Sequence, residues 1–279
     1  MYKIIDGHIH LYPEKLTRAI LGWFEKNEGW EMPYKWSADK HIEHLHGIGV
    51  TEFIVLAYAH KAGISKELNE WLAALVHQYP EIKPYACVHQ EDMNKRDMLK
   101  EFLDKENFYG VKIQCFVQRV SAADERFKEV LELLAEREKG LVLHASSMPA
   151  SSPYVTPEDV AFLLREYPSV RIMVAHLGLP EYHTEYLRLL DKFENLYLDT
   201  AYIFGNQRHD LLFGHNSNNK SNLLRETLNN YSDRIVYGSD FPVMDYPPEK
   251  AIEHIRSLGL GEVKEEKIFY ANAKKFMAI

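Results

Sequence analysis

The chain has 279 residues, of which 46% are hydrophobic and 27% are charged, an ordinary composition for a globular protein. This composition excludes a disordered chain, a collagen-like chain and a coiled coil. With 33 basic and 41 acidic side chains the formal net charge is −8, and no basic cluster stands out, so we expect no nucleic acid partner.

Eight short apolar runs recur along the chain. Most are rich in β-branched residues and most follow a Gly, Pro or Asn, a pattern that is typical of buried strands rather than helices. The predicted strands cover residues 2–9, 52–58, 83–88, 110–117, 140–144, 170–175, 196–199 and 234–237.

Amphipathic stretches with helical spacing fill the gaps between these strands. Thr156 before Pro157 is typical of a helix N-terminus, and Ser121 resembles the first residue of a capping box. Two segments are predicted as excursions: an aromatic-rich one at 23–36, and a long Asn- and Gly-rich loop at 204–222. The predicted helices cover residues 38–46, 67–78, 122–137, 182–193, 222–231, 248–258 and 265–277, with a further helix that begins at 157.

Strands that alternate with helices predict an α/β fold with a parallel sheet. Eight of them match a (β/α)8 TIM barrel, which often occupies ~250 residues as one domain. We therefore expect residues 1–279 to form a single domain. The alternative is an open doubly wound sheet, but no Gly-rich phosphate loop follows the first strand, which argues against its nucleotide-binding form.

The remaining features of the chain predict its surroundings. Cys87 and Cys115 both lie inside apolar runs, which excludes a disulfide scaffold and fits a reducing compartment. The N-terminal residues lack a signal-peptide pattern, and the longest apolar stretches, such as 53–59, fall short of the ~18 residues that span a bilayer. We expect a soluble, cytoplasmic protein without a membrane partner.

Two of the fourteen histidines, His8 and His10, end the first predicted strand. Residues two apart on a strand point to the same face, so both imidazoles are expected to face the barrel mouth together. Asp6 shares that parity and is expected one layer deeper. A lone His-x-His pair is weak evidence, because unrelated surface histidines are common.

Other polar residues occupy the ends of other strands. His144 ends the fifth, His176 the sixth and Asp240 the eighth. Because the carboxyl ends of all barrel strands meet at one mouth, these side chains and the first-strand pair are expected to form one cluster. Nitrogen and carboxylate ligands suit Zn²⁺ and similar divalent ions. The alternative is that each is a polar core residue satisfied by its own neighbours.

Lys112 lies inside the fourth apolar run. A lysine within a buried strand is costly unless its charge is paired, removed or modified. Three states remain open: a deprotonated amine, an inner salt bridge, or a carboxylated lysine that bridges two metal ions.

Together these motifs resemble the amidohydrolase superfamily, and most closely its amidohydrolase 2 branch of metal-dependent hydrolases and decarboxylases. The resemblance runs from residue 6 to about residue 277. The closing segment from Ile268 to Phe276 is similar to the family's last helix. The motifs that carry the resemblance are Asp6-Gly7-His8-Ile9-His10, Gly110-Val111-Lys112, His144, Ala175-His176-Leu177-Gly178 and Gly238-Ser239-Asp240-Phe241-Pro242.

The resemblance implies a role for each matching residue. Lys112 matches a lysine that is carboxylated in some two-metal branches, and His176 matches a ligand in two-metal members or a catalytic residue in one-metal members. Two departures leave the substrate class open: Gln114-Cys115 stands where many relatives carry His-Pro, and Ala145-Ser146-Ser147 follows His144 where a Gly is common. The residues that match the family's metal ligands are His8, His10, His144 and Asp240.

The expected function is hydrolysis of an amide, lactone or ester of a small carboxylic acid. One or two divalent ions, Zn²⁺ or alternatively Mn²⁺, would activate water, Asp240 would move its proton, and His176 would polarise the carbonyl. The alternative is nonoxidative decarboxylation of an aromatic or muconate-type acid, with a cation at the mouth to hold it. The candidate cations are Lys61, Lys112, Arg119 and Arg208.

A third hypothesis is a barrel that has lost catalysis and binds a ligand, for which a broken ligand set would be the sign. We also expect His60 and His89 to be loop histidines with backbone partners. Tyr202 and Phe204 are candidates for stacking on a substrate ring. The tryptophans at 23, 30 and 36 would either roof the site or form a homodimer contact.

Overall fold

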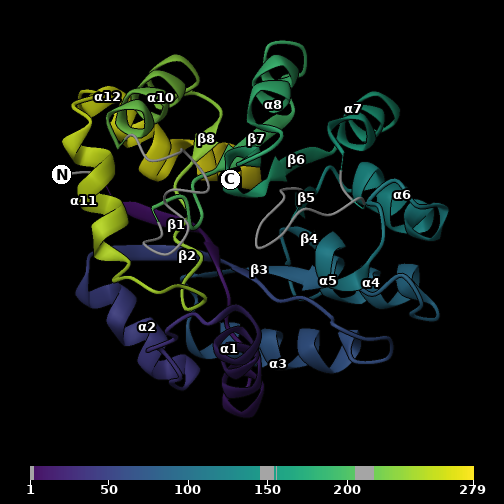
Figure 1. The fold of residues 1–279 in the computed structure, drawn as a ribbon. Coiled ribbons are helices and arrows are strands. Elements are labelled where there is room, and N and C mark those ends of the chain that lie inside the picture. The colour runs from purple at the N-terminus through teal and green to yellow at the C-terminus, as the bar shows by residue number, and fades with distance from the viewer. Residues whose placement is uncertain (1–2, 145–153, 155, 205–216) are drawn as a thin grey trace.

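The computed structural model describes residues 3–144, 154, 156–204 and 217–279. Within them eight strands form one sheet in the order β1 to β8, and every neighbouring pair is parallel. The helices lie around the outside of these strands (Figure 1). The predicted (β/α)8 TIM barrel is thereby confirmed. No helix in the described ranges has the length and apolar character needed to cross a bilayer.

The strand ends lie within two residues of the predicted ones, with one larger difference. The predicted strand 110–117 ends early, because its pairing with β5 stops at Ile113 and the chain then turns into a short helix. The strands are β1 (Ile4–Ile9), β2 (Val50–Leu56), β3 (Ile82–Cys87), β4 (Gly110–Ile113), β5 (Gly140–Leu143), β6 (Arg171–Val174), β7 (Leu196–Asp199) and β8 (Ile235–Val236).

Each predicted helix has a counterpart, and Thr156 caps its helix by accepting a hydrogen bond from the Asp159 N–H. The segment 122–137 is divided, because Asp124 accepts from the Arg126 N–H and starts a separate 3-10 turn. The long helix α1 was not predicted and includes the start of the expected excursion at 23–36. The helices are α1 (Glu14–Glu28), α2 (Ala38–Gly47), α3 (Ser65–Gln78), α4 (Lys95–Asp104), α5 (Cys115–Gln118), η1 (Glu125–Phe127), α6 (Lys128–Glu136), α7 (Pro157–Glu166), η2 (Ala175–Gly178), α8 (His183–Leu190), α10 (Ser217–Asn230), α11 (Glu249–Ser257), α12 (Glu262–Glu266), η3 (Lys267–Ala271) and α13 (Asn272–Met277).

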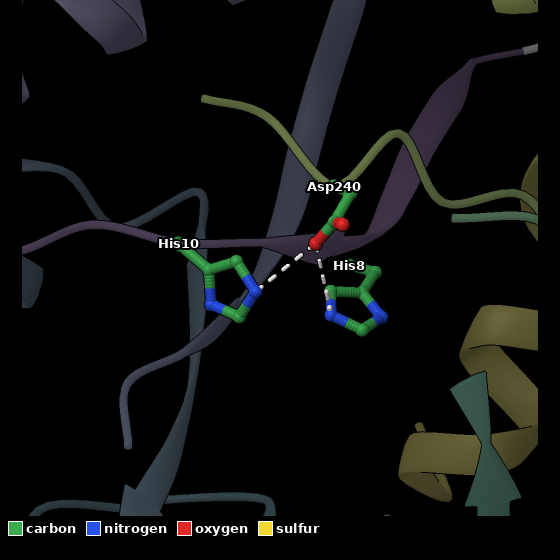
Figure 2. Close-up of side chains that lie close together, drawn as sticks. All are labelled: His8, His10 and Asp240. Carbon is green, nitrogen blue, oxygen red and sulfur yellow. Dashed lines mark ion pairs between the residues drawn. The ribbon is translucent and has the colours of Figure 1, made fainter. Parts of the chain in front are cut away.

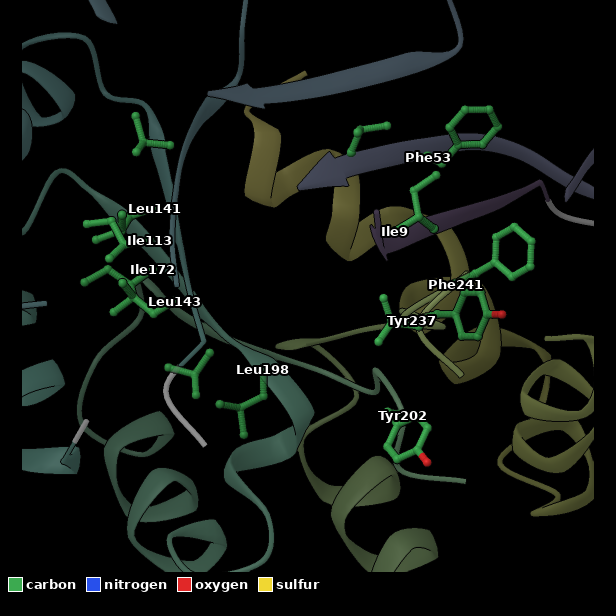
Figure 3. Close-up of a cluster of buried hydrophobic side chains, with 14 of the residues drawn as sticks. Ile9, Phe53, Ile113, Leu141, Leu143, Ile172, Leu198, Tyr202, Tyr237 and Phe241 are labelled. Atoms are coloured by element: carbon green, nitrogen blue, oxygen red, sulfur yellow. The ribbon is translucent and has the colours of Figure 1, made fainter. Parts of the chain in front are cut away.

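The two largest apolar clusters of the described residues hold the barrel together. The larger one lies between the strands and the surrounding helices, and several of its buried side chains are drawn in Figure 3. The smaller one gathers strand residues such as Ile5 and Val142 with Phe276 of α13. The Phe276 ring stacks on Tyr85 at 5.8 Å, so the C-terminal helix supplies part of the same apolar cluster as the strands.

The barrel closes between β1 and the chain around β8. The Gly7 N–H donates to the Tyr237 carbonyl at 2.7 Å, and the His10 N–H donates to the Phe241 carbonyl at 2.8 Å. A Cβ at Gly7 would lie 2.9 Å from the Tyr237 oxygen and closer still to Val236. Only glycine permits this approach, which brings residues from the two ends of the chain into one site.

Candidate metal centre and active site

Three of the predicted ligands meet at the closing seam of the barrel. His8 and His10 come from the end of β1, and Asp240 lies just beyond β8 (Figure 2). The Asp240 Oδ1 atom lies 3.1 Å from His10 Nε2 and 3.4 Å from His8 Nε2. One ligand atom from each residue falls within 4.8 Å of the others, and all three residues are buried.

The hydrogen bonds of the two imidazoles decide which nitrogen faces the cluster. His10 Nδ1 donates to the Leu56 carbonyl at 2.6 Å, and His8 Nδ1 lies 2.7 Å from Asp199 Oδ2. Since a carbonyl or carboxylate oxygen only accepts, each neutral ring carries its proton on Nδ1 and a lone pair on Nε2. Metal-binding histidines are oriented in this way by a second hydrogen bond.

The cluster fits a divalent cation. Among the described residues, His8 Nε2 is buried and has no hydrogen-bond partner. Two lone pairs and a carboxylate oxygen face one another, an arrangement that is unfavourable without a cation between them. Nitrogen and carboxylate donors are the set that Zn²⁺ and Mn²⁺ accept.

Asp199 is a site residue that the sequence analysis missed. Besides holding His8, its Oδ1 accepts hydrogen bonds from the N–H groups of His176 and Ala201 at 2.9 and 3.0 Å. It is the last residue of β7 and is fully buried. Asp199 ends a predicted strand, as the candidate histidines do, so the sequence alone could have placed it at the barrel mouth.

His144 and His176 form a second pair beside the cluster. His176 Nε2 lies 3.2 Å from His144 Nδ1, and the His176 and His8 rings are 5.6 Å apart. His176 Nδ1 donates to the Ala201 carbonyl at 2.8 Å, so neutral His176 accepts at Nε2. His144 Nδ1 must then donate, which places the lone pair of neutral His144 on Nε2.

The backbone is left-handed at two of these residues. φ is +61° at His176 and +76° at Asp240, values that non-glycine residues rarely adopt. The Asp240 N–H donates to the His8 carbonyl at 2.9 Å, and the His176 N–H is held by Asp199. These bonds fix the unusual conformations that turn both side chains toward the cluster.

Burial and neighbouring charges set the protonation of the cluster. Burial, reinforced by Lys112, holds the pKa of His8 well below its usual range, so His8 is neutral at neutral pH. Burial alone would raise the pKa of Asp240. His10 and the other imidazoles beside the carboxylate more than offset the effect of burial, so the Asp240 pKa lies below its ordinary value and the carboxylate is ionised.

Lys112 is fully buried, and its Nζ has no hydrogen-bond partner among the described residues. Burial lowers its pKa to about 8, while the negative charges of Asp199 and Asp240 oppose that shift. Because no ion pair joins Lys112 to a described carboxylate, the inner salt bridge is not formed in this structure. The deprotonated and carboxylated states stay as predictions.

Asp6 does not follow the simple alternation expected for β1. The register against β2 shifts between Asp6 and Ile9, so Asp6 lies opposite Phe53, whose ring belongs to the outer core. Its Oδ1 accepts from the N–H groups of His8 and Ser239, and burial raises its pKa to about 7. Asp6 therefore ties the two closing segments together through their backbones.

A cavity of about 590 Å³ lies over the cluster. Its wall includes His10, His144, His176 and Asp240, together with Arg119 as a cation. Lys61 is exposed and is not part of the wall, and Arg208 lies outside the described residues. The aromatic side chains of the wall are Trp23, Phe24, Trp30, Tyr58, Phe116, Tyr154 and Tyr202.

Some of the other side chains that the sequence predicted near the site line the cavity, and others lie outside it. His60 is part of the wall, whereas His89 accepts a hydrogen bond from the Glu91 N–H as a loop histidine. The Trp30 ring stacks on Tyr202 at 4.9 Å within the wall. Phe204 instead contacts His254, at 4.7 Å between ring centroids. A homodimer stays a prediction.

Comparison with known proteins assigns the family. The amidohydrolase family model Amidohydro_2 matches residues 5–278. The chain belongs to the amidohydrolase family. This confirms the family that the motifs resemble. A search of curated proteins finds no match for this amidohydrolase.

Solved structures share the fold of this amidohydrolase at low sequence identity. An uncharacterized TIM-barrel protein from Bordetella bronchiseptica is 20% identical, with a TM-score of 0.74 and coverage of 99% of this chain and 98% of that one. A protein from Acinetobacter baumannii, described as a probable 2-pyrone-4,6-dicarboxylic acid hydrolase with citric acid bound, is 15% identical, with a TM-score of 0.68 and coverage of 99% and 100%.

A 5-carboxyvanillate decarboxylase from Novosphingobium aromaticivorans, with bound manganese, is 15% identical, with a TM-score of 0.65 and coverage of 100% of this chain and 97% of that one. The amidohydrolase described here thus shares its fold with solved structures that are described as a hydrolase and a decarboxylase. The metal dependence of its family agrees with the cluster of His8, His10 and Asp240.

Proposed function

We propose that this amidohydrolase is a metal-dependent hydrolase that cleaves an amide, lactone or ester bond of a small substrate bearing a carboxylate. The observation that carries the proposal is the convergence of His8, His10 and Asp240 beside the cavity, with a buried, unpartnered Nε2 on His8. His144, from the end of β5, is proposed as the fourth ligand, because its neutral tautomer carries a lone pair on Nε2.

One divalent ion, Zn²⁺ or alternatively Mn²⁺, is the simplest occupant. When bound, it would supply Lewis-acid chemistry and lower the pKa of water from 15.7 towards ~7. The described residues bring three ligand atoms within 4.8 Å, whereas His176 pairs with His144 instead. A second ion would require Lys112 to be carboxylated and His176 to turn away from His144.

The protein's own groups would then move the protons. Asp240 is ionised, so it is equipped to accept a proton from water and to return it to the leaving group. His176 is proposed to hold the oxygen of the polarised carbonyl, for which its Nε2 must leave the hydrogen bond from His144 Nδ1 and act as a donor. Aromatic side chains around the cavity would limit the access of bulk water.

The first test is the metal content of protein purified without chelator, measured by plasma mass spectrometry. We expect about one equivalent of Zn²⁺ or Mn²⁺ per chain, and its loss in the His8→Ala/His10→Ala double variant. Two equivalents would support a carboxylated Lys112. Protein that neither holds metal nor binds it when it is supplied would overturn the proposal and favour a binding protein.

The second test concerns the proton acceptor. In Asp240→Asn, the remaining ligands should keep part of the metal, while turnover should fall on the order of 10²–10⁴-fold, the usual contribution of a general base. Metal content is measured on the same sample, so that lost metal is not mistaken for lost proton transfer. Turnover close to wild type at equal metal content would exclude this role for Asp240.

Decarboxylation of an aromatic acid is the second candidate. It is favoured by the stacked Trp30 and Tyr202 rings in the cavity wall and by the guanidinium of Arg119. In that reaction the carbon–carbon bond to the carboxylate breaks, carbon dioxide leaves and a proton takes its place on carbon. Metal-loaded protein should therefore be assayed against both lactones or esters and aromatic acids. Acid release without carbon dioxide supports hydrolysis, and carbon dioxide release supports the alternative.

A further inference from the structure

The groups that meet at the candidate centre are mainly hydrogen-bond acceptors. The neutral rings of His8, His10 and His144 carry lone pairs on Nε2, and Asp240 is an ionised carboxylate. When water attacks an ester, lactone or amide, the carbonyl oxygen gains negative charge, and a hydrogen-bond donor at that oxygen stabilises the transition state. The proposed hydrolysis therefore benefits from a donor outside the set of candidate ligands.

Two donors near the centre are already engaged within the protein. His176 Nε2 accepts from His144 Nδ1 at 3.2 Å, so it becomes a donor only after leaving that bond. The hydroxyl of Tyr202, a tyrosine of the cavity wall, donates to Asp245 Oδ1 at 3.2 Å. A hydroxyl on the side of the cavity where His10 lies is the next group to consider.

Tyr58 carries such a hydroxyl. It lies two residues beyond the end of β2, is 8% exposed, and shares the cavity wall with His10 and Asp240. A phenol keeps its proton at neutral pH, because its ordinary pKa is about 10. Burial, followed by the negative charge of Asp240, raises the pKa of Tyr58 further. The hydroxyl is therefore a donor that lies within the field of the candidate centre.

Ring contacts hold Tyr58 beside the centre. Its ring lies edge-on to His10, with 5.5 Å between ring centroids and 90° between planes, and edge-on to Tyr12 at 5.6 Å. The Tyr58 N–H also donates to the Tyr12 hydroxyl at 3.2 Å. Two residues earlier, the Leu56 carbonyl accepts from His10 Nδ1. One short segment at the end of β2 therefore orients a candidate metal ligand and presents a phenol next to it.

We propose that Tyr58 is a further catalytic residue, whose hydroxyl donates a hydrogen bond to the substrate oxygen that gains negative charge. The inference rests on the proposed function, because it assigns a donor to the hydrolysis at the same centre. No bond to Tyr58 forms or breaks, and the proton stays on the phenol. The hydrogen bond becomes stronger as charge develops on the substrate oxygen, so it favours the transition state over the bound substrate.

The test measures ligand binding to protein loaded with Co²⁺, whose visible spectrum reports on its ligands. Acetohydroxamate binds metal ions through oxygen atoms that accept hydrogen bonds, whereas imidazole binds through nitrogen and then has only an N–H to offer. For Tyr58→Phe we expect acetohydroxamate to bind about tenfold more weakly, the size of a lost hydrogen bond to a charged group, and imidazole to stay within about twofold of wild type.

Tyr197→Phe is the matched control, because it removes the hydroxyl of another buried tyrosine that is not part of the wall. It should bind both probes as wild type does, and an equal loss in the two variants would overturn the inference. Turnover gives a second measurement: in Tyr58→Phe, kcat should fall on the order of 10²–10³-fold, with KM within about threefold of wild type.

The Co²⁺ content of each sample separates this inference from the proposed function. Normal Co²⁺ uptake with unchanged acetohydroxamate affinity in Tyr58→Phe would overturn the role of Tyr58 and leave the metal centre in place. Reduced Co²⁺ uptake in Tyr58→Phe, or an equal loss of imidazole binding, would make Tyr58 a support of His10 rather than a catalytic residue. Wild-type protein that takes up no Co²⁺ would overturn the proposed function, and the inference with it.

Discussion

At the scale of single residues, the candidate centre depends on which nitrogen of each imidazole carries the proton. A hydrogen bond to the Asp199 carboxylate orients the His8 ring, and a hydrogen bond to the Leu56 carbonyl orients the His10 ring. Asp199 also accepts from the N–H groups of His176 and Ala201, so one side chain orients a candidate ligand and the neighbouring histidine together. This shared support makes Asp199 a positioning residue.

The Asp199→Asn variant tests that role. An amide group cannot accept from all three partners, because its NH₂ would face a donor, so His8 loses its fixed orientation. We expect metal affinity to fall about 10–100-fold, as is usual for outer-shell partners of metal ligands. A competition titration with a coloured chelator measures it, with the exposed Asp191→Asn as the control. Unchanged affinity in Asp199→Asn would argue against a positioning role.

His41 of α2 supports the loop that carries part of the candidate centre. It is fully buried, and its Nε2 donates to the Tyr34 carbonyl at 2.8 Å. The ring packs edge-on against Phe241, with 5.0 Å between ring centroids, beneath the loop that carries Asp240. Burial lowers the pKa of His41 from 6.5 to about 4.

This shift predicts a loss of stability in acid. In the unfolded chain His41 binds a proton near pH 6.5, whereas in the folded chain it does so only near pH 4. The contribution of His41 to the free energy of unfolding is therefore complete above pH 6.5 and decreases as the pH falls from 6.5 to about 4. The contribution is about 2 kcal/mol between pH 7.5 and pH 5. Urea unfolding at both pH values should show a smaller difference for His41→Gln than for wild type. The exposed His77→Gln should behave like wild type, and an equal change in both variants would contradict the prediction.

At the scale of elements, the C-terminal helix α13 completes the apolar interior that the strands begin. Phe276 is fully buried between Tyr85 and Tyr197, with ring centroids at 5.8 and 5.5 Å. The contacts join the last turn of the chain to β3 and β7. This helix is therefore part of the barrel's core rather than an appendage.

Phe276→Ala should destabilise the protein by about 3–5 kcal/mol, the range for deleting a buried phenylalanine ring and leaving a cavity. The same substitution at Phe162, whose side chain is 43% exposed on α7, should cost much less. Urea unfolding of the two variants measures the difference. Similar losses at the two positions would show that α13 does not share the core.

At the scale of the whole molecule, closure of the barrel assembles the centre from residues far apart in the chain. The close approach at Gly7 brings β1 to the segment after β8, and the Asp240 N–H then bonds to the His8 carbonyl. A bound ion would therefore cross-link the first and last strands. Binding that exists only in the folded state must stabilise that state.

Removal of metal should accordingly lower the midpoint of thermal unfolding. At an ion concentration of about 100 times Kd, the stabilisation is about 2.7 kcal/mol. Differential scanning fluorimetry with added Zn²⁺ or Mn²⁺ after chelation should restore the midpoint in wild type. The His8→Ala/His10→Ala variant should show no response, and an equal response in that variant would place the ion elsewhere.

The sequence by itself determined the barrel and most of its candidate ligands. Each apolar run followed by a helical pattern indicates a buried strand and its connecting helix. These runs also show that five polar residues lie at strand ends: His8, His10, His144, His176 and Asp240. Because all strands of the barrel are parallel, their carboxyl ends lie together at one mouth. Local periodicity and the number of strands are therefore enough to predict the barrel and the residues at its mouth.

Tertiary structure alone decided how those side chains meet. The register shift in β1 removes Asp6 from the expected face, and the short helix α5 replaces the end of a predicted strand. The backbone turn at His176 pairs it with His144, and the cavity wall includes Arg119 but not Lys61. Such features depend on register, barrel closure and side-chain packing between segments distant in sequence, and a local pattern of polar and apolar residues carries no information about them.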